Sequence, residues 1–224
     1  MNKIYPDSGV EVQGVAARHY DFFMNLMSFG LYPKFIRGAV DAMGIQASDR
    51  IIDLGCGTGR NTRLMHEHLG SEGHILGLDI SSDMERQYRH NCRDLENVNF
   101  QNQRVDVPFS LDAPVDRSWM SFVIHGFPHE VRLQVIQNLY DNLKPGGTLC
   151  ILDFAEFDLA KMPAYYRIPF KAVECPYAFD FIARDWKAIL GDRGFSDFEE
   201  VFWFKNYVRL LKAKKVAPAA HDAA

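Results

Sequence analysis

The feature that most constrains the fold is the stretch at residues 51–62, which joins an apolar run to a glycine-rich turn. The apolar run includes Asp53, glycines follow at every second position, and apolar residues then recur at helical spacing from Leu64 to Leu69. This pattern predicts a strand, a sharp turn and a helix. Glycines let a ligand approach the backbone closely, and a helix N-terminus offers N–H groups to a polar or anionic ligand. We therefore predict a ligand-binding turn, with a tight turn that binds nothing as the alternative.

A second apolar run, residues 74–80, also contains an acidic residue near its end, Asp79. Asp79 lies 20 residues beyond Gly59, where a carboxylate at the end of a strand can accept hydrogen bonds from both hydroxyls of a ribose. Ser81 is a suitable N-cap for a helix that we expect to run to about Asn91. A capping role for Asp79 itself is the alternative.

Short apolar strands alternate with helical patterns through the rest of the chain. Further strands are predicted at 98–101, 119–124 and 148–154, and a helix that contains Val131 to Leu143 is ended by the Lys-Pro-Gly-Gly run at 144–147. Residues 155–180 interrupt the alternation, a helix follows at about 181–190, and 198–205 with 207–211 form a predicted antiparallel hairpin. Alternation of this kind favours an α/β, doubly wound, seven-stranded and mostly parallel sheet, with the carboxyl ends of the parallel strands at one edge.

The N-terminal segment is rich in aromatic residues and methionine. Helices are predicted at 19–30 and 33–44, each ended by a glycine. They are either a pair packed on the core or a lid over the ligand. We expect a lid over residues 1–44, a main domain over 45–213 and a disordered tail over 214–224.

Composition limits the classes of protein that fit. The 224 residues, of which 47% are hydrophobic, suffice for one sizeable α/β domain. The 25 basic and 29 acidic residues give a net charge of -4 without a basic stripe, so no nucleic-acid partner is expected. The four cysteines show no metal-ligand spacing, which predicts free thiols and no metal site. Without a signal peptide or a membrane-spanning run, the expected location is the cytoplasm.

Five segments together resemble the class I S-adenosylmethionine-dependent methyltransferases. They are residues 53–59, 78–81, 107–109, 121–125 and 143–147, and their order and spacing match across about 45–155. Residues 20–21 with 27–30 are similar to the ubiquinone/menaquinone biosynthesis C-methyltransferase family within that superfamily. The resemblance implies a Rossmann-like fold, S-adenosylmethionine as cofactor, and a small-molecule acceptor such as a quinol or phenol, methylated at carbon or oxygen.

The resemblance also implies which residues bind the cofactor. The turn would hold the methionine portion, with Asp53 near its amino group, Asp79 on the ribose and Ile80 against the adenine. Gln103, which replaces the family's usual Asp, would lie beside the adenine, and Tyr20 would close over the sulfonium. The full set is Tyr20, Asp53, Gly55, Cys56, Gly57, Thr58, Gly59, Thr62, Asp79, Ile80, Gln103, Arg104 and Ser121.

The segment expected to contact the acceptor departs from the quinone enzymes. They have an arginine and an asparagine after the fourth strand, whereas this chain has His125 to Glu130, so the resemblance leaves the acceptor open. An acceptor oxygen or carbon must lose a proton, and histidine is a suitable base near neutral pH. His125 is the first candidate, His129 the second and His19 the third, each with a capping or core role as the alternative. Glu174 and Tyr177 are placed in the acceptor pocket.

Other functions share parts of this pattern. An NAD-dependent oxidoreductase would share the turn and Asp79, but Arg60 stands where its third glycine is expected. A non-catalytic S-adenosylmethionine-binding module fits the same residues. An arsenite or thiol methyltransferase needs clustered cysteines, which the sequence does not place together. A lipid quinol as acceptor would bring the chain to a membrane surface, and assembly as a homodimer is compatible with the sequence.

Overall fold

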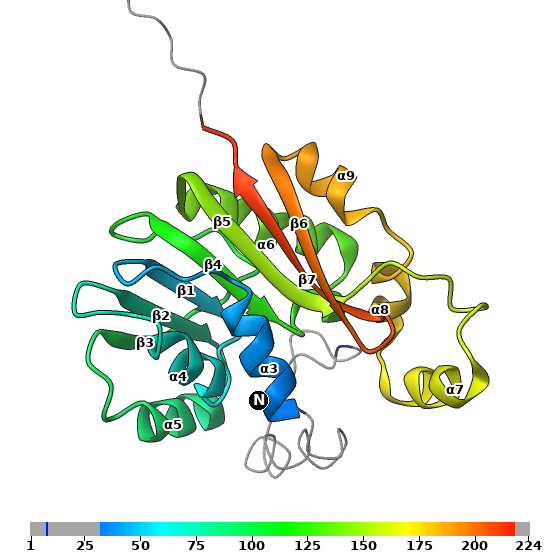
Figure 1. Ribbon diagram of the computed structural model, residues 1–224, viewed down its shortest axis with the longest axis horizontal. Helices are drawn as coiled ribbons and strands as arrows, with labels where there is room; N and C mark the ends of the chain where they lie inside the picture. Colours follow the sequence, from blue (N-terminus) through cyan, green and yellow to red (C-terminus); the bar gives the residue numbers. More distant parts are fainter. Residues whose placement is uncertain (1–7, 9–31, 218–224) are drawn as a thin grey trace, which may run out of the picture.

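The computed structural model describes Ser8 and residues 32–217, and its strands form a single sheet. The strand order is β3-β2-β1-β4-β5-β7-β6 (Figure 1). Strands β3, β2, β1, β4 and β5 are parallel, whereas β7 runs antiparallel to both β5 and β6. The predicted seven-stranded α/β fold with a C-terminal antiparallel hairpin is confirmed.

The elements have the following bounds. The strands are β1 (Arg50–Leu54), β2 (His74–Asp79), β3 (Val98–Asn102), β4 (Val115–Ser121), β5 (Leu143–Phe154), β6 (Phe195–Trp203) and β7 (Val208–Lys215). The helices are α3 (Tyr32–Asp41), α4 (Arg60–His66), α5 (Ser82–Asn91), the 3-10 turn η1 (Ile124–Gly126), α6 (His129–Asn142), α7 (Ala164–Val173), α8 (Pro176–Phe181) and α9 (Trp186–Gly191).

Successive side chains of the central strands point to opposite faces of the sheet, and each face has its own helices. Ile51 packs in the cluster with α3 and α4, whereas Ile52 packs in the cluster with α6, α8 and α9. This explains why the central strands are apolar on both sides rather than alternating with polar residues.

The direction of the chain across the sheet reverses at β1. From β1 the chain proceeds outward to β2 and β3, then returns to β4 on the opposite side of β1. In a parallel sheet this reversal opens a crevice outside the carboxyl ends of the two strands, because the following segments turn in opposite directions. The glycine turn follows β1 and therefore lies at this crevice.

The end of β4 differs from the prediction. The strand begins at Val115 and ends at Ser121, so residues 122–124 are not part of it. Phe122 has a φ of +53°, a left-handed conformation that a non-glycine residue rarely adopts and that ends the strand. Its ring packs 6.3 Å from that of Phe35 and 5.9 Å from that of Phe154, measured between centroids, which compensates part of the strain.

Two helix predictions also need correction. Helix α6 ends at Asn142, and the Lys-Pro-Gly-Gly run lies within β5, where Leu143 pairs with Val115 before the register shifts. The helix predicted at 181–190 begins only at Trp186, because α8 ends at Phe181 and the Asp185 side chain accepts a hydrogen bond from the Ala188 N–H, which starts α9.

Both strands of the C-terminal hairpin differ from their predicted bounds of 198–205 and 207–211. Strand β6 starts at Phe195 and ends at Trp203. Strand β7 continues to Lys215, so the predicted tail boundary at 214 is wrong by two residues. The Lys215 ammonium donates to the Tyr140 carbonyl at 2.6 Å and the Leu143 carbonyl at 2.8 Å, which fixes the end of the strand.

Helix α3 is part of the core. Phe35, Ile36, Ala39 and Val40 are buried against the sheet, so the predicted lid over residues 1–44 is wrong for this helix. The helix predicted at 19–30 lies outside the described residues, and a lid formed there stays a prediction. None of the described helices has the length and apolar character needed to cross a bilayer.

A pair of asparagines on α6 holds the long segment between β3 and β4. The Asn138 amide donates to the carbonyls of Val105 and Val107, both at 2.8 Å, and Asn142 does the same for Phe109 at 3.0 Å. These bonds fix the path of the chain from the edge strand β3 to β4, one of the two strands whose carboxyl ends border the crevice.

We expect Asn138→Ala to lower the free energy of unfolding by about 1–3 kcal/mol, because two carbonyls lose their donor. Urea denaturation of the full chain measures the change. The matched control is Gln137→Ala on the same helix, which removes only an exposed bond to Asp141 and should change stability by less than about 0.5 kcal/mol. Equal effects of the two variants would contradict the structural role of Asn138.

Candidate active site

The glycine turn is held against the end of β2 by backbone hydrogen bonds. The N–H groups of Gly55 and Cys56 both donate to the Leu78 carbonyl, at 2.8 and 3.1 Å, and the Gly59 N–H donates to the Cys56 carbonyl at 3.0 Å. Gly55, Gly57 and Gly59 have φ values of +67°, +53° and +80°. The turn therefore requires three left-handed residues in five positions, 55 to 59, which explains the spacing of the glycines.

The three glycines meet different surroundings. A Cβ on Gly55 would lie 2.5 Å from Cγ2 of Val123, and one on Gly59 would lie 2.7 Å from Sγ of Cys92. Among the described residues, a Cβ on Gly57 would meet nothing closer than the Gly55 carbonyl at 4.0 Å. The outer two glycines thus allow close packing within the protein, whereas the middle one borders open space that a ligand could use.

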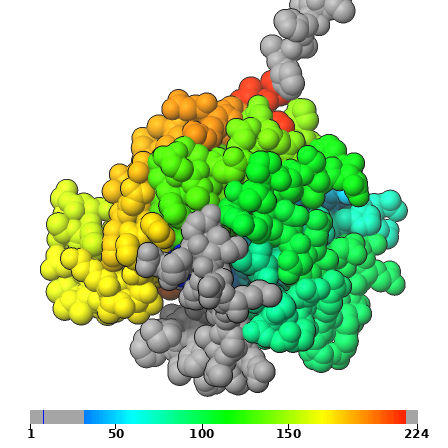
Figure 2. All heavy atoms as spheres, turned by 180° about the vertical axis from the view of Figure 1, so that it is seen from behind, coloured from blue at the N-terminus to red at the C-terminus, as the bar shows by residue number. Residues whose placement is uncertain are grey.

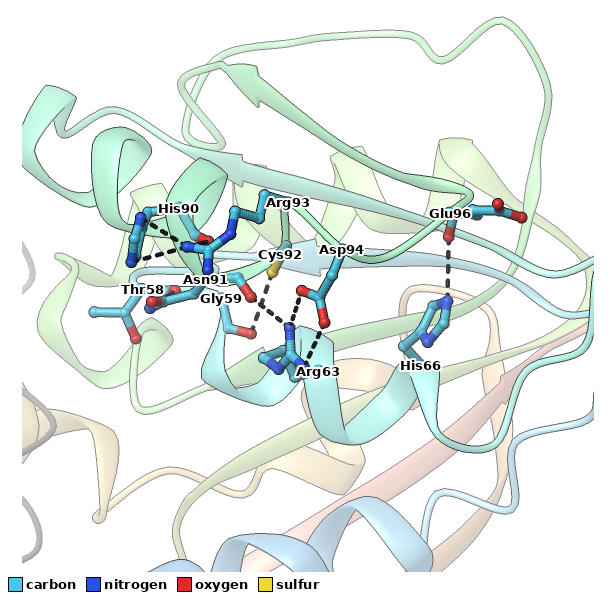
Figure 3. A network of polar contacts seen from close by, with 10 residues as sticks. All are labelled: Thr58, Gly59, Arg63, His66, His90, Asn91, Cys92, Arg93, Asp94 and Glu96. Atoms are coloured by element: carbon cyan, nitrogen blue, oxygen red, sulfur yellow. Dashed lines mark hydrogen bonds and ion pairs between the residues drawn. The ribbon is translucent and has the colours of Figure 1, made fainter.

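The end of α5 anchors the turn from outside (Figure 3). The Asn91 amide donates to the Thr58 carbonyl at 2.9 Å, and the Cys92 thiol contacts the Gly59 carbonyl at 3.7 Å. Arg63 of α4 donates to the Asn91 carbonyl at 2.5 Å and makes two bonds to the Asp94 carboxylate. Figure 3 shows side chains from α4 and from the end of α5 converging on Thr58 and Gly59, so this network supports the second half of the turn.

Asp79 connects the turn to the end of β2. Its Oδ2 accepts a bond from the Gly57 N–H at 3.0 Å, and its Oδ1 accepts one from the Ser81 N–H at 2.9 Å. Burial raises the pKa of Asp79, while these backbone donors and the Ile80 N–H lower it, and burial is the larger effect. A carboxylate held in this way is a fixed acceptor at the crevice.

Asp53 lies deeper and is completely enclosed. Its Oδ2 accepts a bond from the Thr62 hydroxyl at 2.8 Å, and only 1% of its surface is exposed. Burial raises the pKa of Asp53 to about 7; the Thr62 bond lowers it, and the neighbouring Asp79 raises it further. Since a single neutral hydroxyl does not offset burial, a cationic ligand group nearby would favour the ionised form.

Other predicted cofactor residues lie around the same turn. Ile80 is 36% exposed at the end of β2, Ser121 ends β4, and no side chain caps the start of α4. The Cys56 side chain packs beneath Gly77, so only its backbone faces the turn. These features fit a ligand with a polar chain, a ribose and a flat apolar base. Tyr20 and His19 lie outside the described residues.

Gln103 and Arg104 are placed beside the end of β3. The Gln103 N–H donates to the Asp79 carbonyl at 3.1 Å, which brings its backbone to the crevice. Its side-chain amide donates to the Arg104 carbonyl, and the Arg104 guanidinium pairs with Asp106 at 2.6 Å. The side chains therefore bond within their own segment, and a role beside an adenine stays a prediction.

Two cysteines that are distant in sequence are close in the fold. Cys56 and Cys92 pack with Tyr88 in one buried cluster. All four cysteines are free thiols. Burial raises the pKa of Cys92 to about 11 and holds that of Cys56 well above its ordinary value. Thiols with raised pKa values are poor nucleophiles, so this cluster does not support arsenite or thiol chemistry.

His125 lies in η1, directly after β4, and meets two carboxyl groups. Its Nδ1 is 2.7 Å from Oδ1 of Asp153 at the end of β5, and its Nε2 is 3.6 Å from Oε2 of Glu174, which follows α7. Burial lowers the pKa of His125, but the charge and hydrogen bond of Asp153 and the charge of Glu174 outweigh it, so the pKa is raised. The side chain is 11% exposed.

Arg132 of α6 holds this region together and was not predicted from the sequence. Its buried guanidinium donates to the carbonyls of Ile124 at 3.2 Å and His125 at 3.0 Å, and pairs with Asp180 at 2.7 Å. It also donates to the carbonyl of Tyr177 at 2.5 Å, whereas the predicted role of the Tyr177 side chain stays a prediction.

The second histidine candidate is directed elsewhere. The His129 ring lies 6.4 Å from that of Trp186, and its Nδ1 has no hydrogen-bond partner within the described part of the chain. Burial and Arg184 lower its pKa. Of the two described histidine candidates, only His125 is paired with a carboxylate at the carboxyl ends of the strands.

Comparisons with known proteins agree with this geometry. Residues 51–147, which run from β1 through the turn to the start of β5, match the family model described as a methyltransferase domain. Residues 51–147 therefore form a methyltransferase domain. A demethylmenaquinone methyltransferase from Listeria welshimeri is 29% identical over 171 residues, covering 75% of this chain and 71% of that protein. A ubiquinone/menaquinone biosynthesis C-methyltransferase from Pectobacterium atrosepticum is 27% identical over 188 residues, covering 82% and 70%.

Solved structures share the fold of the methyltransferase. A SAM-dependent methyltransferase from Aquifex aeolicus superposes with a TM-score of 0.59 at 19% identity, covering 81% of this chain and 89% of that one. An N-methyltransferase from Bradyrhizobium japonicum, solved with S-adenosyl-L-homocysteine, gives 0.59 at 12% identity and covers 84% and 87%. At these identities the likeness concerns the fold alone.

We expect Gly57→Ala to weaken S-adenosylmethionine binding at least about tenfold, because the new methyl enters the open side of the turn. Isothermal titration calorimetry measures the dissociation constant. Gly44→Ala is the matched control: Gly44 has a φ of +70° and nothing within 4 Å of a new Cβ. Both variants should lose about 1–2 kcal/mol of stability from backbone strain, but only the first should lose affinity. Equal affinities would contradict the assignment of the open side.

The raised pKa of Asp53 predicts an unusual dependence of stability on pH. Because the folded state binds this proton more tightly than the unfolded state, stability is fully present below the ordinary aspartate pKa of 3.8 and falls as pH rises to about 7. Asp53→Asn removes this loss, so the variant should gain on the wild type by up to about 4 kcal/mol across that window. Urea denaturation of the ligand-free protein at several pH values tests this. A difference that does not change with pH would contradict the assigned pKa.

Proposed function

We propose that this methyltransferase acts on a small aromatic acceptor of the quinol or phenol class, at carbon or oxygen, with His125 as the general base. The observation that supports this most is the contact of His125 with Asp153 at the carboxyl ends of the strands. Val123, two residues before His125, packs against Gly55, so the base lies next to the cofactor turn. The names of the curated relatives, which act on menaquinone and ubiquinone precursors, point to the same acceptor class.

The cofactor would be held by the turn and the ends of β1 and β2. Asp53 would attract its amino group, Gly57 would leave room for its backbone contact, and Asp79 would accept hydrogen bonds from its hydroxyls. When bound, S-adenosylmethionine supplies an electrophilic methyl group on a sulfonium. What the protein must add is alignment of the acceptor, removal of its proton and exclusion of water.

His125 is oriented for proton transfer. Asp153 would accept a hydrogen bond from Nδ1–H, which leaves Nε2 unprotonated in the neutral ring. Nε2, on the side of Glu174, would then take the proton from an acceptor hydroxyl. The Asp153 carboxylate also accepts from the His125 and Phe154 backbone N–H groups, at 3.3 and 2.8 Å, so its position is fixed. Arg132 holds the carbonyl of His125, which fixes the other side of the residue.

The surroundings of the ring favour the charge that forms. Glu174 faces Nε2 and would stabilise the imidazolium after proton uptake. The rings of Phe154 and Phe181 lie 5.1 and 6.4 Å from the His125 ring between centroids. These aromatic walls suit a planar acceptor and limit the access of water to the base.

We expect His125→Ala to lower kcat by about 10²–10⁴-fold on a phenol or quinol, because the proton loses its acceptor. The rate of the wild type should rise with pH through a midpoint above 6.5, since the base must be unprotonated and its pKa is raised. Asp153→Asn should move that midpoint downward, because burial then acts without the carboxylate. A pH–rate profile measures this shift independently of how much enzyme is folded.

His74→Gln is the matched control for a histidine change, because His74 begins β2 at the opposite edge of the sheet. It should leave the profile unchanged. Retention of the full rate by His125→Ala, or an unmoved midpoint in Asp153→Asn, would contradict the base assignment.

Binding and turnover distinguish this proposal from its alternatives. Calorimetry should detect S-adenosylmethionine and not NADH, and turnover with a panel of quinols, phenols and amines identifies the acceptor class. Binding without turnover on every acceptor would favour a non-catalytic module, and turnover on amines alone would contradict the proposed acceptor.

A further inference from the structure

Helix α7 differs from every other described helix of its length in that none of its ten residues is buried. Exposed fractions reach 63% for Tyr165, 67% for Ile168 and 70% for Val173. Single exposed apolar side chains are common on protein surfaces, but a group of large ones on one helix marks an interaction surface. Figure 2 shows this segment, in yellow, at the surface of one end of the molecule.

The two faces of α7 have different roles. Phe170 and Glu174 are four residues apart and face inward: the Phe170 ring lies 5.0 Å from that of Phe154, and Glu174 approaches His125. The opposite face presents an apolar surface to solvent. Its exposed members are Ala164, Tyr165, Ile168, Pro169, Ala172 and Val173.

Positive charge surrounds the apolar face. Helix α7 contains Arg167 and Lys171 and no acidic residue. Lys205, from the turn between β6 and β7, has its Nζ 3.4 Å from the Tyr165 hydroxyl and 5.4 Å from the centre of the Tyr166 ring. The whole chain has a net charge of -4, so a basic surface here is a local departure. Asp158 nearby is already paired with Lys161 at 3.7 Å.

We propose that the outer face of α7, with Lys205, docks on a membrane surface that contains anionic lipid. An amphipathic helix with apolar and aromatic residues outward and basic residues at its margin is suited to lie in the interface of a bilayer, where tyrosine is favoured and lysine meets lipid phosphate. A neutral or acidic partner without an apolar region would leave the apolar side chains of this face in contact with water.

The docking surface bears on the proposed function through its position. Glu174, directly after this helix, approaches His125 from the inner side, so docking would bring the proposed base close to a membrane-dissolved acceptor. In this respect the inference rests on the proposed function, but binding to lipid requires no methyl transfer and is tested without an acceptor.

The test is co-sedimentation of the full-length protein with vesicles of equal parts phosphatidylglycerol and phosphatidylcholine, against vesicles of phosphatidylcholine alone. The wild type should bind the anionic vesicles more tightly, and added salt should weaken the binding. Ile168→Asp and Lys171→Glu should each weaken it by about tenfold or more.

The chain offers matched controls at the end of β7, which Figure 1 places away from α7. Val216 is 46% exposed and Lys214 is exposed, so Val216→Asp and Lys214→Glu make the same chemical changes elsewhere and should bind like the wild type. Thermal unfolding of each variant shows whether the fold is retained.

Several outcomes would overturn the docking surface: absence of vesicle binding by the wild type, equal binding by Ile168→Asp and Val216→Asp, or self-association in sedimentation that Ile168→Asp abolishes. The last would assign the face to a second copy of the chain. Methylation of a water-soluble quinol should be unchanged in Ile168→Asp. Vesicle binding by a wild type that methylates no quinol would instead sustain the docking surface and contradict the proposed function.

Discussion

The approach of Val123 to Gly55 is the contact on which the site depends. The segments after β1 and β4 belong to neighbouring parallel strands, and the first lacks a side chain where the second approaches it, since a Cβ there would lie 2.5 Å from Val123. Any larger residue at 55 would push the two segments apart. The missing side chain therefore joins the proposed cofactor turn to the proposed base, His125, two residues beyond Val123. The absence of a side chain at residue 55 is thus required for the proposed cofactor turn and the proposed base to lie side by side.

The sequence sufficed for the parts of the site that are encoded locally. Asp53 and Asp79 stand at the ends of apolar runs, and the turn between them is recognisable from its glycines, so their positions follow from chain order and sheet topology. Asp153 ends a similar apolar run and has the same signal, yet its importance depends on His125, 28 residues earlier. Arg132 gives no signal, because a single arginine on a helix is ordinarily exposed and only the packing of α8 encloses it. Such residues are defined by tertiary contacts.

The incorrect boundaries have a common physical origin. Residues 119–124 are apolar except for Ser121, and periodicity alone cannot reveal that Phe122 adopts a left-handed backbone and ends β4 early. The strain is tolerated because the Phe122 ring packs between aromatic side chains from α3 and β5. Similarly, Asp185 restarts a helix inside a run with continuous helical spacing. In both places a tertiary or capping interaction overrides a local preference, and in the first it also directs His125 into the site.

The carboxyl groups of the site differ in the neighbouring groups that offset the cost of burying their negative charge. Asp153 has a histidine and two backbone N–H groups, and Asp79 has backbone donors. Within the described part of the chain, Asp53 has a single neutral hydroxyl and accordingly a pKa of about 7. A group balanced this poorly makes the ligand-free fold less stable near neutral pH and gains the most from a cationic group placed beside it. The arrangement sacrifices stability at the position where the proposed cofactor's amino group would lie. The turn would therefore favour that cofactor over a neutral competitor because the amino group of the cofactor compensates the buried charge of Asp53, and not because of a large preformed apolar pocket.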